Sequence, residues 1–144
     1  MSDTGTVVES VVESHAGITM VRASENFRSW RTAEYPAGLS ARNVGAKELS
    51  MNVSTLPPGG VISAHIHVGF EVGIYVLEGA MRYEYGPGLT ETMTGGPGDF
   101  IFVEPGVPHE VFNVSDTEPA ISVVARSSAD EWDQIIPYDR ASGL

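Results

Sequence analysis

The stretch GGVISAHIHVGFEVGIYVLEG, residues 59–79, holds two of the four histidines of this 144-residue chain. His65 and His67 are separated by one residue, so on a β-strand their side chains point to the same face, about 7 Å apart along the strand. Both imidazoles can then reach one small ion, and the aliphatic residues around them would hold the rings in place. The spacing predicts a metal site, and the alternative is a pair of polar side chains on a solvated strand face.

A second stretch, GDFIFVEPGVPHEVFN at residues 98–113, supplies a third histidine. It predicts a strand, a turn at Pro105 and Gly106, and another strand that begins at His109. The third histidine strengthens the metal-site prediction, because zinc sites in proteins use three or four protein ligands. His15, the fourth histidine, is expected on the surface, and the alternative is a fourth imidazole ligand.

Short apolar runs separated by glycine and proline make up most of the chain, which has 16 glycines and nine prolines. Besides the strand that carries the first two histidines, strands are expected over residues 49–55, 74–77, 81–85, 100–103, 111–114 and 121–125. Short strands with turn signals between them predict an all-β sandwich or barrel. A short C-terminal helix is also expected, because residues 128–131 have the form of a capping box before Trp132 and Ile135.

Composition limits the kind of partner that the chain can have. Eight basic residues stand against 19 acidic ones, for a net charge of −11. Such a chain is poorly suited to nucleic acid or to an anionic membrane, so neither is an expected partner. The sequence has no cysteine, so imidazole, carboxylate or water must hold any metal. With no leader-like or membrane-spanning run, a single cytoplasmic domain over residues 1–144 is expected.

Taken in order, the two stretches resemble the paired motifs of the cupin superfamily. The first has the form Gly-x5-His-x-His-x3-Glu and closes at Gly79, and the second has a Gly-Asp pair, a Pro-Gly turn, a histidine and an asparagine. The resemblance covers about residues 55–126. It implies a double-stranded β-helix, or jelly-roll, barrel, in which His65, His67 and His109 converge on a divalent metal ion.

Glu71 departs from the commonest form of the first motif, in which the glutamate occupies the position held here by Val72. Because side chains alternate along a strand, this one-residue slip would turn Glu71 away from the metal. A β-bulge near Gly73 would restore its direction. We expect Glu71 to be the fourth ligand through such a bulge. The alternative is an outward Glu71, with Phe70 or Val72 at the cavity and a site of three histidines.

The apolar sides of the strands are expected to meet in the interior of the barrel, with space left above the ion because a catalytic metal keeps open positions. The residues expected to line this cavity are Met51, Val53, Ser63, Phe70, Met81, Tyr83, Tyr85, Phe102 and Val111. Such a lining suits a hydrophobic or aromatic small molecule. Zinc, iron, nickel and manganese all suit imidazole ligands with or without a carboxylate, and we favour zinc.

Within the superfamily, the chain is similar to small cupin cyclases of bacterial aromatic-polyketide and antibiotic biosynthesis. That resemblance implies a metal-dependent cyclase, with His65, His67 and His109 as its catalytic residues through an ion that polarises a ketone for aldol-type ring closure. One alternative is a dioxygenase for an aromatic or diketone substrate, with Glu71 completing the site. Another is a non-enzymatic barrel that binds a small ligand. The resemblance also implies a homodimer.

Overall fold

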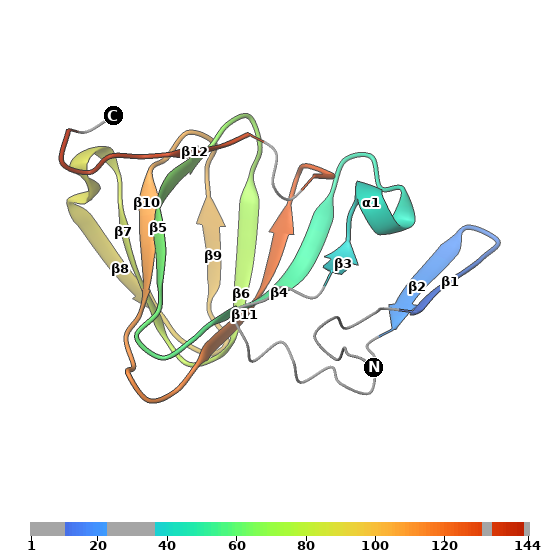
Figure 1. The fold of residues 1–144 in the computed structure, drawn as a ribbon, viewed down its shortest axis with the longest axis horizontal. Coiled ribbons are helices and arrows are strands. Elements are labelled where there is room, and N and C mark those ends of the chain that lie inside the picture. The colour runs from blue at the N-terminus through green and yellow to red at the C-terminus, as the bar shows by residue number, and fades with distance from the viewer. Residues whose placement is uncertain (1–10, 23–36, 131–133, 143–144) are drawn as a thin grey trace, which may run out of the picture.

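The computed structural model describes residues 11–22, 37–130 and 134–142 of the chain, and these are mostly β-strands (Figure 1). A hairpin of β1 (Val11–His15) and β2 (Ile18–Arg22) forms a two-stranded sheet of its own. The other strands are β3 (Ala37–Leu39), β4 (Ser50–Leu56), β5 (Val61–His67), β6 (Val72–Glu78), β7 (Met81–Tyr85), β8 (Glu91–Gly95), β9 (Phe100–Val103), β10 (His109–Asn113), β11 (Ala120–Arg126) and β12 (Ile135–Pro137).

These ten strands form two five-stranded sheets in which all neighbours are antiparallel. One sheet has the order β12-β5-β10-β7-β8 and the other the order β3-β4-β11-β6-β9. From β4 to β7 each strand lies in the sheet opposite to the one before it, and Figure 1 shows the two sheets facing each other. This crossing back and forth is the topology of a double-stranded β-helix. The predicted all-β jelly-roll barrel is therefore confirmed, and each of the six predicted strand ranges overlaps a strand.

The space between the sheets is filled by side chains whose period of two is visible in the sequence. In β7, Met81 and Tyr83 are buried whereas Arg82 and Glu84 lie on the outer face. A hydrophobic cluster of both sheets contains the buried residues Leu56, Val76, Met81, Tyr83, Val111 and Ala120. Each large side chain of this kind contributes about 1.5–3 kcal/mol when it is fully buried. The burial of these alternating residues holds the two sheets together.

Helix is rare among the described residues, and the described residues on either side of 131–133 are not helical where a C-terminal helix was expected. Ile135 lies in β12, which pairs with β5, and residues 131–133 lie outside the described part of the chain. The capping-box serine, Ser128, makes local hydrogen bonds with Asp130: its Oγ accepts from the Asp130 N–H and donates to the Asp130 carbonyl oxygen. Pairing with the open edge of β5 satisfies the backbone of β12 and prevails over the local helical signal. No described helix is long and apolar enough to cross a membrane.

A short helix that the sequence analysis did not predict, α1 (Ala41–Val44), has complete caps. Ser40 and Asn43 form a capping box at its start, and Gly45 ends it with a left-handed backbone. A 3-10 turn, η2 (Pro87–Leu89), connects β7 to β8. Neither element touches the site described below, so the functional geometry depends on the strands.

The chain passes from β6 in one sheet to β7 in the other through Gly79 and Ala80 alone. Gly79 has a φ of 76°, and a Cβ placed on it would lie 2.6 Å from the Pro119 carbonyl oxygen and 2.8 Å from the Ala120 Cα. Both neighbours are backbone atoms of an adjacent segment, so they cannot move aside as a flexible side chain would. This close approach explains why the first motif ends on a glycine.

Replacing Gly79 with alanine should therefore destabilise the protein by about 2–4 kcal/mol, through a left-handed backbone and a steric clash together. Gly59→Ala is the matched control, since Gly59 has a φ of 68° but nothing within 4 Å of an added Cβ. It should cost only about 1–2 kcal/mol. Urea unfolding of the two variants measures the difference, and equal losses of stability would contradict this account.

Candidate metal centre

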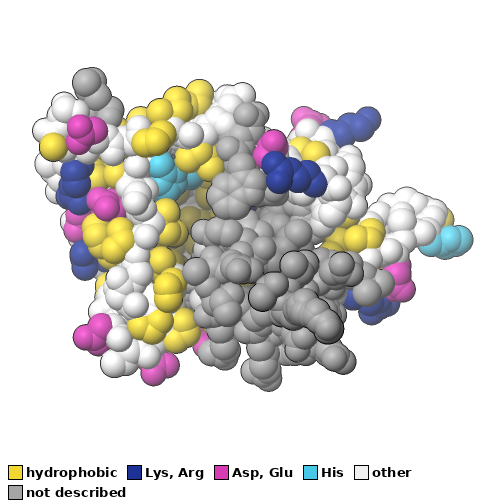
Figure 2. Space-filling model, in the orientation of Figure 1, with side chains coloured by type: hydrophobic (Ala, Val, Ile, Leu, Met, Phe, Trp, Pro, Cys, Tyr) yellow, Lys and Arg dark blue, Asp and Glu magenta, His cyan; other side chains and the backbone are white. Residues whose placement is uncertain are grey.

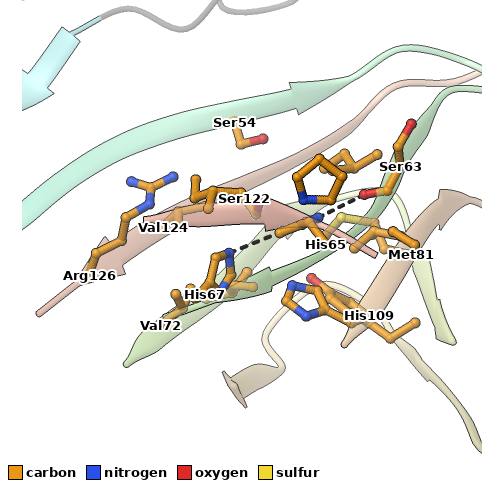
Figure 3. A pocket seen from close by; sticks show the side chains of 17 residues that line it. Ser54, Ser63, His65, His67, Val72, Met81, His109, Ser122, Val124 and Arg126 are labelled. Carbon is orange, nitrogen blue, oxygen red and sulfur yellow. Dashed lines mark hydrogen bonds between the residues drawn. The ribbon is translucent and has the colours of Figure 1, made fainter. Parts of the chain in front are cut away.

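Three histidines meet because two neighbouring strands place them opposite each other. β5 and β10 are adjacent, and His65 of β5 is the register partner of His109 of β10. Cross-strand partners have Cβ atoms about 4.5–5.5 Å apart on one face of the sheet. His67 lies two residues farther along β5 and so points to the same face. The three ring centroids lie 4.3–4.8 Å apart. Figure 2 shows histidine side chains beside hydrophobic ones, and Figure 3 shows the three rings close together.

Backbone carbonyls orient two of the three rings. The Nδ1 atom of His65 lies 2.8 Å from the Ser63 oxygen, and that of His109 lies 2.9 Å from the Val107 oxygen. Each Nδ1–H donates to its carbonyl, which leaves Nε2 without a proton and with its lone pair toward the cluster. The Nε2 atoms of His65 and His67 lie 3.0 Å apart. One potential ligand nitrogen from each histidine lies within 4.8 Å of the other two.

The third ring, that of His67, is deeply buried with the Phe70 ring 5.1 Å from its centroid. Its Nδ1 finds no hydrogen-bond partner among the described residues. The pKa of His67 is lowered to about 3, mainly by burial and in part by electrostatic repulsion from His109, His65 and Arg126. Burial also lowers the pKa of His109 to about 4 and is the main cause of the lowered pKa of His65.

The three imidazoles are therefore neutral near pH 7, which is the form in which histidine binds a metal. Burying such rings without a partner would cost free energy, and His67 has a buried nitrogen that no described group satisfies. Two rings held through Nδ1 with Nε2 turned toward a common point match the way in which backbone acceptors orient metal-binding histidines. The donor set present thus fits a divalent transition-metal ion.

Glu71 does not join the histidines, contrary to the expectation that a bulge turns it inward. Its side chain is exposed, and its backbone N–H donates to Ser127 Oγ at 2.9 Å. The ladder between β6 and β9 runs without a shift through Val72 and Gly73. With no bulge at Gly73, the alternation places Val72 at the cavity and Glu71 outside. The arrangement is the three-histidine alternative.

A cavity of about 370 Å³ adjoins the three histidines. Ser63, Met81, Tyr83 and Val111 line it, as the sequence predicts. The other described lining residues, apart from the histidines, are Ser54, Ile62, Ala64, Val72, Ile74, Ser122, Val124, Arg126, Ile135 and Pro137. The volume is near the lower end of the range for sites that bind small molecules. The wall is mostly apolar, and its polar side chains besides the histidines are those of Ser54, Ser63, Tyr83, Ser122 and Arg126.

The phase of β4 is opposite to the prediction, so Met51 and Val53 do not line the cavity. Met51 is 38% exposed, whereas Asn52 and Ser54 are buried on the inner side. Inside, the Asn52 Oδ1 accepts a hydrogen bond from Arg126 Nη1 at 2.5 Å. A strand whose polar face finds such partners can turn that face inward, although the hydrophobic pattern alone favours the other face.

Three predicted aromatic residues also lie outside the cavity wall. Phe102 is 63% exposed, because Ile101 and Val103 are the inward residues of β9. In an all-apolar strand the alternation does not say which face is buried. Tyr85 lines a separate cleft with Met93 and the β9 aromatics, and Phe70 packs behind His67.

Two features of the cavity wall were not predicted from the sequence, namely Arg126 and the pair Ile135 and Pro137. His15 is exposed at the end of β1 and does not belong to the histidine cluster. Arg126, at the end of β11, lines the cavity. Ser122, Val124 and Arg126 are alternate residues of β11 and therefore share a face. The inward position of Arg126 could have been predicted if Val124 had been known to face inward. Ile135 and Pro137 were hidden by the helical signal of the C-terminus.

The arrangement of strands is shared with proteins of known structure. No curated protein sequence matches the chain. The polyketide cyclase RemF from Streptomyces resistomycificus is 24% identical over 72% of this chain and 68% of that one, with a TM-score of 0.60. An oxalate oxidase in complex with glycolate is 23% identical over 67% of this chain and 51% of that one, with a TM-score of 0.58. The oxalate decarboxylase of Lactobacillus farciminis is 19% identical over 72% of this chain and 30% of that one, with a TM-score of 0.61.

At these identities the likeness of structure concerns the fold alone, and this chain spans about half of the oxalate oxidase chain and a smaller share of the decarboxylase. The family model of the cupin domain matches residues 52–125, about half of the chain. That range contains β5 and β10 with all three clustered histidines. The chain belongs to the cupin domain family.

Proposed function

We propose that this protein is a metal-dependent enzyme that closes a ring in a poly-β-keto substrate by an aldol-type reaction. The observation that carries the proposal is the convergence of three neutral imidazoles at the wall of a mostly apolar cavity. An apolar wall suits a carbon chain that must be folded rather than a sugar or a phosphate. The likeness to a polyketide cyclase supports this substrate class.

His65, His67 and His109 would hold the ion, for which we favour zinc. When bound, a divalent ion supplies Lewis-acid chemistry by polarising a carbonyl group. Three protein ligands leave room for a substrate oxygen, as in other catalytic sites. The exposed position of Glu71 leaves the ligand set neutral, so the histidines do not reduce the charge of the ion.

The remaining cavity residues bind and orient the substrate. Burial raises the pKa of Tyr83 to about 12, so its hydroxyl keeps its proton near pH 7. Tyr83 is therefore suited to donate a hydrogen bond to a carbonyl oxygen rather than to act as a base. Met81, Val111 and Ile135 shape the space in which two carbons of the substrate meet and exclude water from it.

A dioxygenase is the second candidate, supported by the likeness to an oxalate oxidase. It would use the same three histidines with a redox-active ion. Its predicted fourth ligand, Glu71, is exposed, which makes the dioxygenase the weaker of the two candidates. Metal analysis of the protein, purified without added metal, separates the candidates. Zinc would favour ring closure, whereas iron or copper together with oxygen uptake would favour the dioxygenase.

The function itself is tested with a linear poly-β-keto substrate mimic and the zinc-loaded protein. We expect a single cyclised product, whereas spontaneous cyclisation gives a mixture of regioisomers. The protein with its metal removed by a chelator should give the spontaneous mixture. Liquid chromatography with mass spectrometry and NMR identifies the products. The same mixture with and without loaded protein would contradict the proposal.

His67→Ala should weaken metal binding by more than about hundredfold, because it removes one of the three converging nitrogen donors and leaves only two. The matched control is His15→Ala, which changes an exposed histidine outside the cluster and should keep one metal ion per chain. Elemental analysis and competition with a chromophoric chelator measure both. Full metal occupancy in His67→Ala would refute the site.

Glu71→Gln should leave metal affinity within about twofold of the unchanged protein, because an exposed carboxylate outside the cluster contributes little to binding. The same chelator competition applies. A loss of affinity of tenfold or more (about 1.4 kcal/mol) would show that Glu71 reaches the ion in the metal-bound protein.

The metal-free protein should lose stability as the pH falls from about 7 to about 5. The pKa of His67 is lowered from 6.5 to about 3 and that of His109 from 6.5 to about 4. In this window the unfolded chain binds more protons than the folded one, so the free energy of unfolding decreases by about 2 kcal/mol for each of the two residues.

Urea unfolding of the metal-free protein at the two pH values measures this loss. In His67→Gln one of the titrating groups is absent, so the loss between the same pH values should be smaller. The window lies above the usual pKa values of carboxyl groups, so their titration contributes little. Equal stability at the two pH values would contradict the expected burial of neutral histidines.

A further inference from the structure

A second cleft lies at the side of the barrel where the two sheets end in different strands. β8 is the last strand of one sheet and β9 is the last strand of the other, and no pairing within the described part of the chain joins them. A cleft of about 300 Å³ lies between these two edges, and its described lining comes from β7, β8, β9 and the turn before β9. It is distinct from the cavity of the metal centre, which is lined by other strands as well.

One layer of side chains separates the cleft from that cavity. Ile74 of β6 lines the cavity, and its register partner on β9, Ile101, lines the cleft. Met81 of β7 lines the cavity, and its register partner on β8, Gly95, lines the cleft. Tyr83 lines both spaces. Since neighbouring strands lie about 4.8 Å apart, the cleft begins roughly one strand spacing beyond the cavity.

Aromatic and methionine side chains form the open part of the cleft. Phe100 is 81% exposed, Phe102 63% and Met93 62%. Large apolar side chains that are exposed together in this way mark a binding site. Ring faces and a thioether sulfur both pack well against an aromatic group. Asp99 is the one charged residue among the described residues that line the cleft, so an anion is disfavoured there. The cleft therefore suits a neutral aromatic group.

The size of the metal-centre cavity indicates what occupies the cleft. At about 370 Å³, the cavity is near the lower end of the range for sites that bind small molecules. A poly-β-keto chain long enough to fold on itself needs more space than a compact ligand. The cleft adds about 300 Å³ on the other side of Tyr83. One elongated substrate can therefore use both spaces.

We propose that the cleft between β8 and β9 binds an aromatic end of the substrate while the keto end lies at the metal centre. The substrate class is then a keto chain that already carries a neutral aromatic group. The inference rests on the proposed function for the identity of the keto end, and it adds a second binding site to that function. Tyr83 lies between the two parts of the substrate.

Methyl NMR of protein that is isotope-labelled at its methionines reports on both spaces, because Met81 lines the cavity and Met93 lines the cleft. The two ligands are acetylacetone and the same diketone with a naphthylethyl group on one terminal carbon. With zinc-loaded protein, acetylacetone should shift the Met81 signal alone, whereas the naphthyl diketone should shift both signals. The methyl groups of Met20 and Met51 line neither space and serve as internal references.

Calorimetric titration measures the contribution of the cleft to affinity. The naphthyl diketone should bind at least about tenfold more tightly than acetylacetone, because its rings leave water for the cleft. Met93→Ser and Phe102→Ser should each lose about five- to tenfold in affinity for the naphthyl diketone and keep the affinity for acetylacetone within about twofold. Both side chains are mostly exposed, so these variants should remain folded.

The matched control is Met51→Ser, the same substitution at a methionine that is 38% exposed and lines neither space. This variant should bind both ligands as the unchanged protein does. Elemental analysis should show one zinc ion per chain in all three variants, since none of them changes a histidine. Thermal unfolding checks that each variant is folded, and light scattering measures its state of association.

Naphthylethanol and metal-free protein separate this inference from the proposed function, because neither a keto group nor an ion is then present. A shift of the Met93 signal that is lost in Phe102→Ser would support the aromatic site even if no ring closure were found. Ring closure with unchanged binding of the naphthyl diketone in Met93→Ser and Phe102→Ser would overturn the aromatic site alone. A naphthyl diketone that shifts only Met81 would overturn it as well. The same holds if the two variants change the state of association and not the binding, because the cleft would then be a contact between copies of the chain.

Discussion

The pairing of β10 with β5 is the constraint on which the rest of the site depends. It sets His109 opposite His65, and the period of two then brings His67 to the same face. A shift of one residue would turn His109 out of the cluster. Since the ladder is irregular between His109 and Val111, its register is not held by β-pairing alone.

Asn113, four residues after His109, helps to hold the register of β10. Its buried Nδ2 donates to the carbonyl oxygens of Leu56, Pro57 and Glu118, at 3.2, 3.1 and 2.8 Å, and its Oδ1 accepts from the Ser115 N–H at 2.9 Å. These bonds tie the end of β10 to the end of β4. The asparagine that closes the second motif therefore holds a strand in register and has no direct contact with the metal site.

Some features of this site follow from local sequence patterns, whereas others depend on contacts between residues far apart in the sequence. Strands such as β7 and the spacing of the three histidines are local patterns, and both were predicted. The inward face of β4 depends on a hydrogen bond from Arg126 of the neighbouring strand β11 to Asn52, 74 residues earlier in the chain, so no local pattern reveals it. The position of Ile135 likewise depends on the open edge of β5. Glu71 lies between these cases, because the alternation favoured an outward side chain and only an assumed bulge turned it inward.

The C-terminal segment holds the second edge of β5, and pairing on both edges keeps the two histidines of this strand in place. On the edge opposite to β10, β12 pairs Ile135 with His67 and Pro137 with His65. Arg140 then bonds to Glu84 of β7 and Glu110 of β10, each at 2.8 Å. Exposed ion pairs contribute little energy singly, but these two fix the segment beside the strand that carries His109.

Ile135 and Pro137 also line the cavity, so the segment that covers the edge of β5 shapes the binding site as well. The fold gathers three neutral histidines at the cavity wall, and the buried Nδ1 of His67 has no hydrogen-bond partner among the described residues, which costs stability. A ligand that binds only the folded state stabilises it in proportion to the logarithm of its concentration over its dissociation constant. A divalent ion at the three imidazoles is a ligand of this kind, because its bonds to the ring nitrogens would offset the cost of burying them.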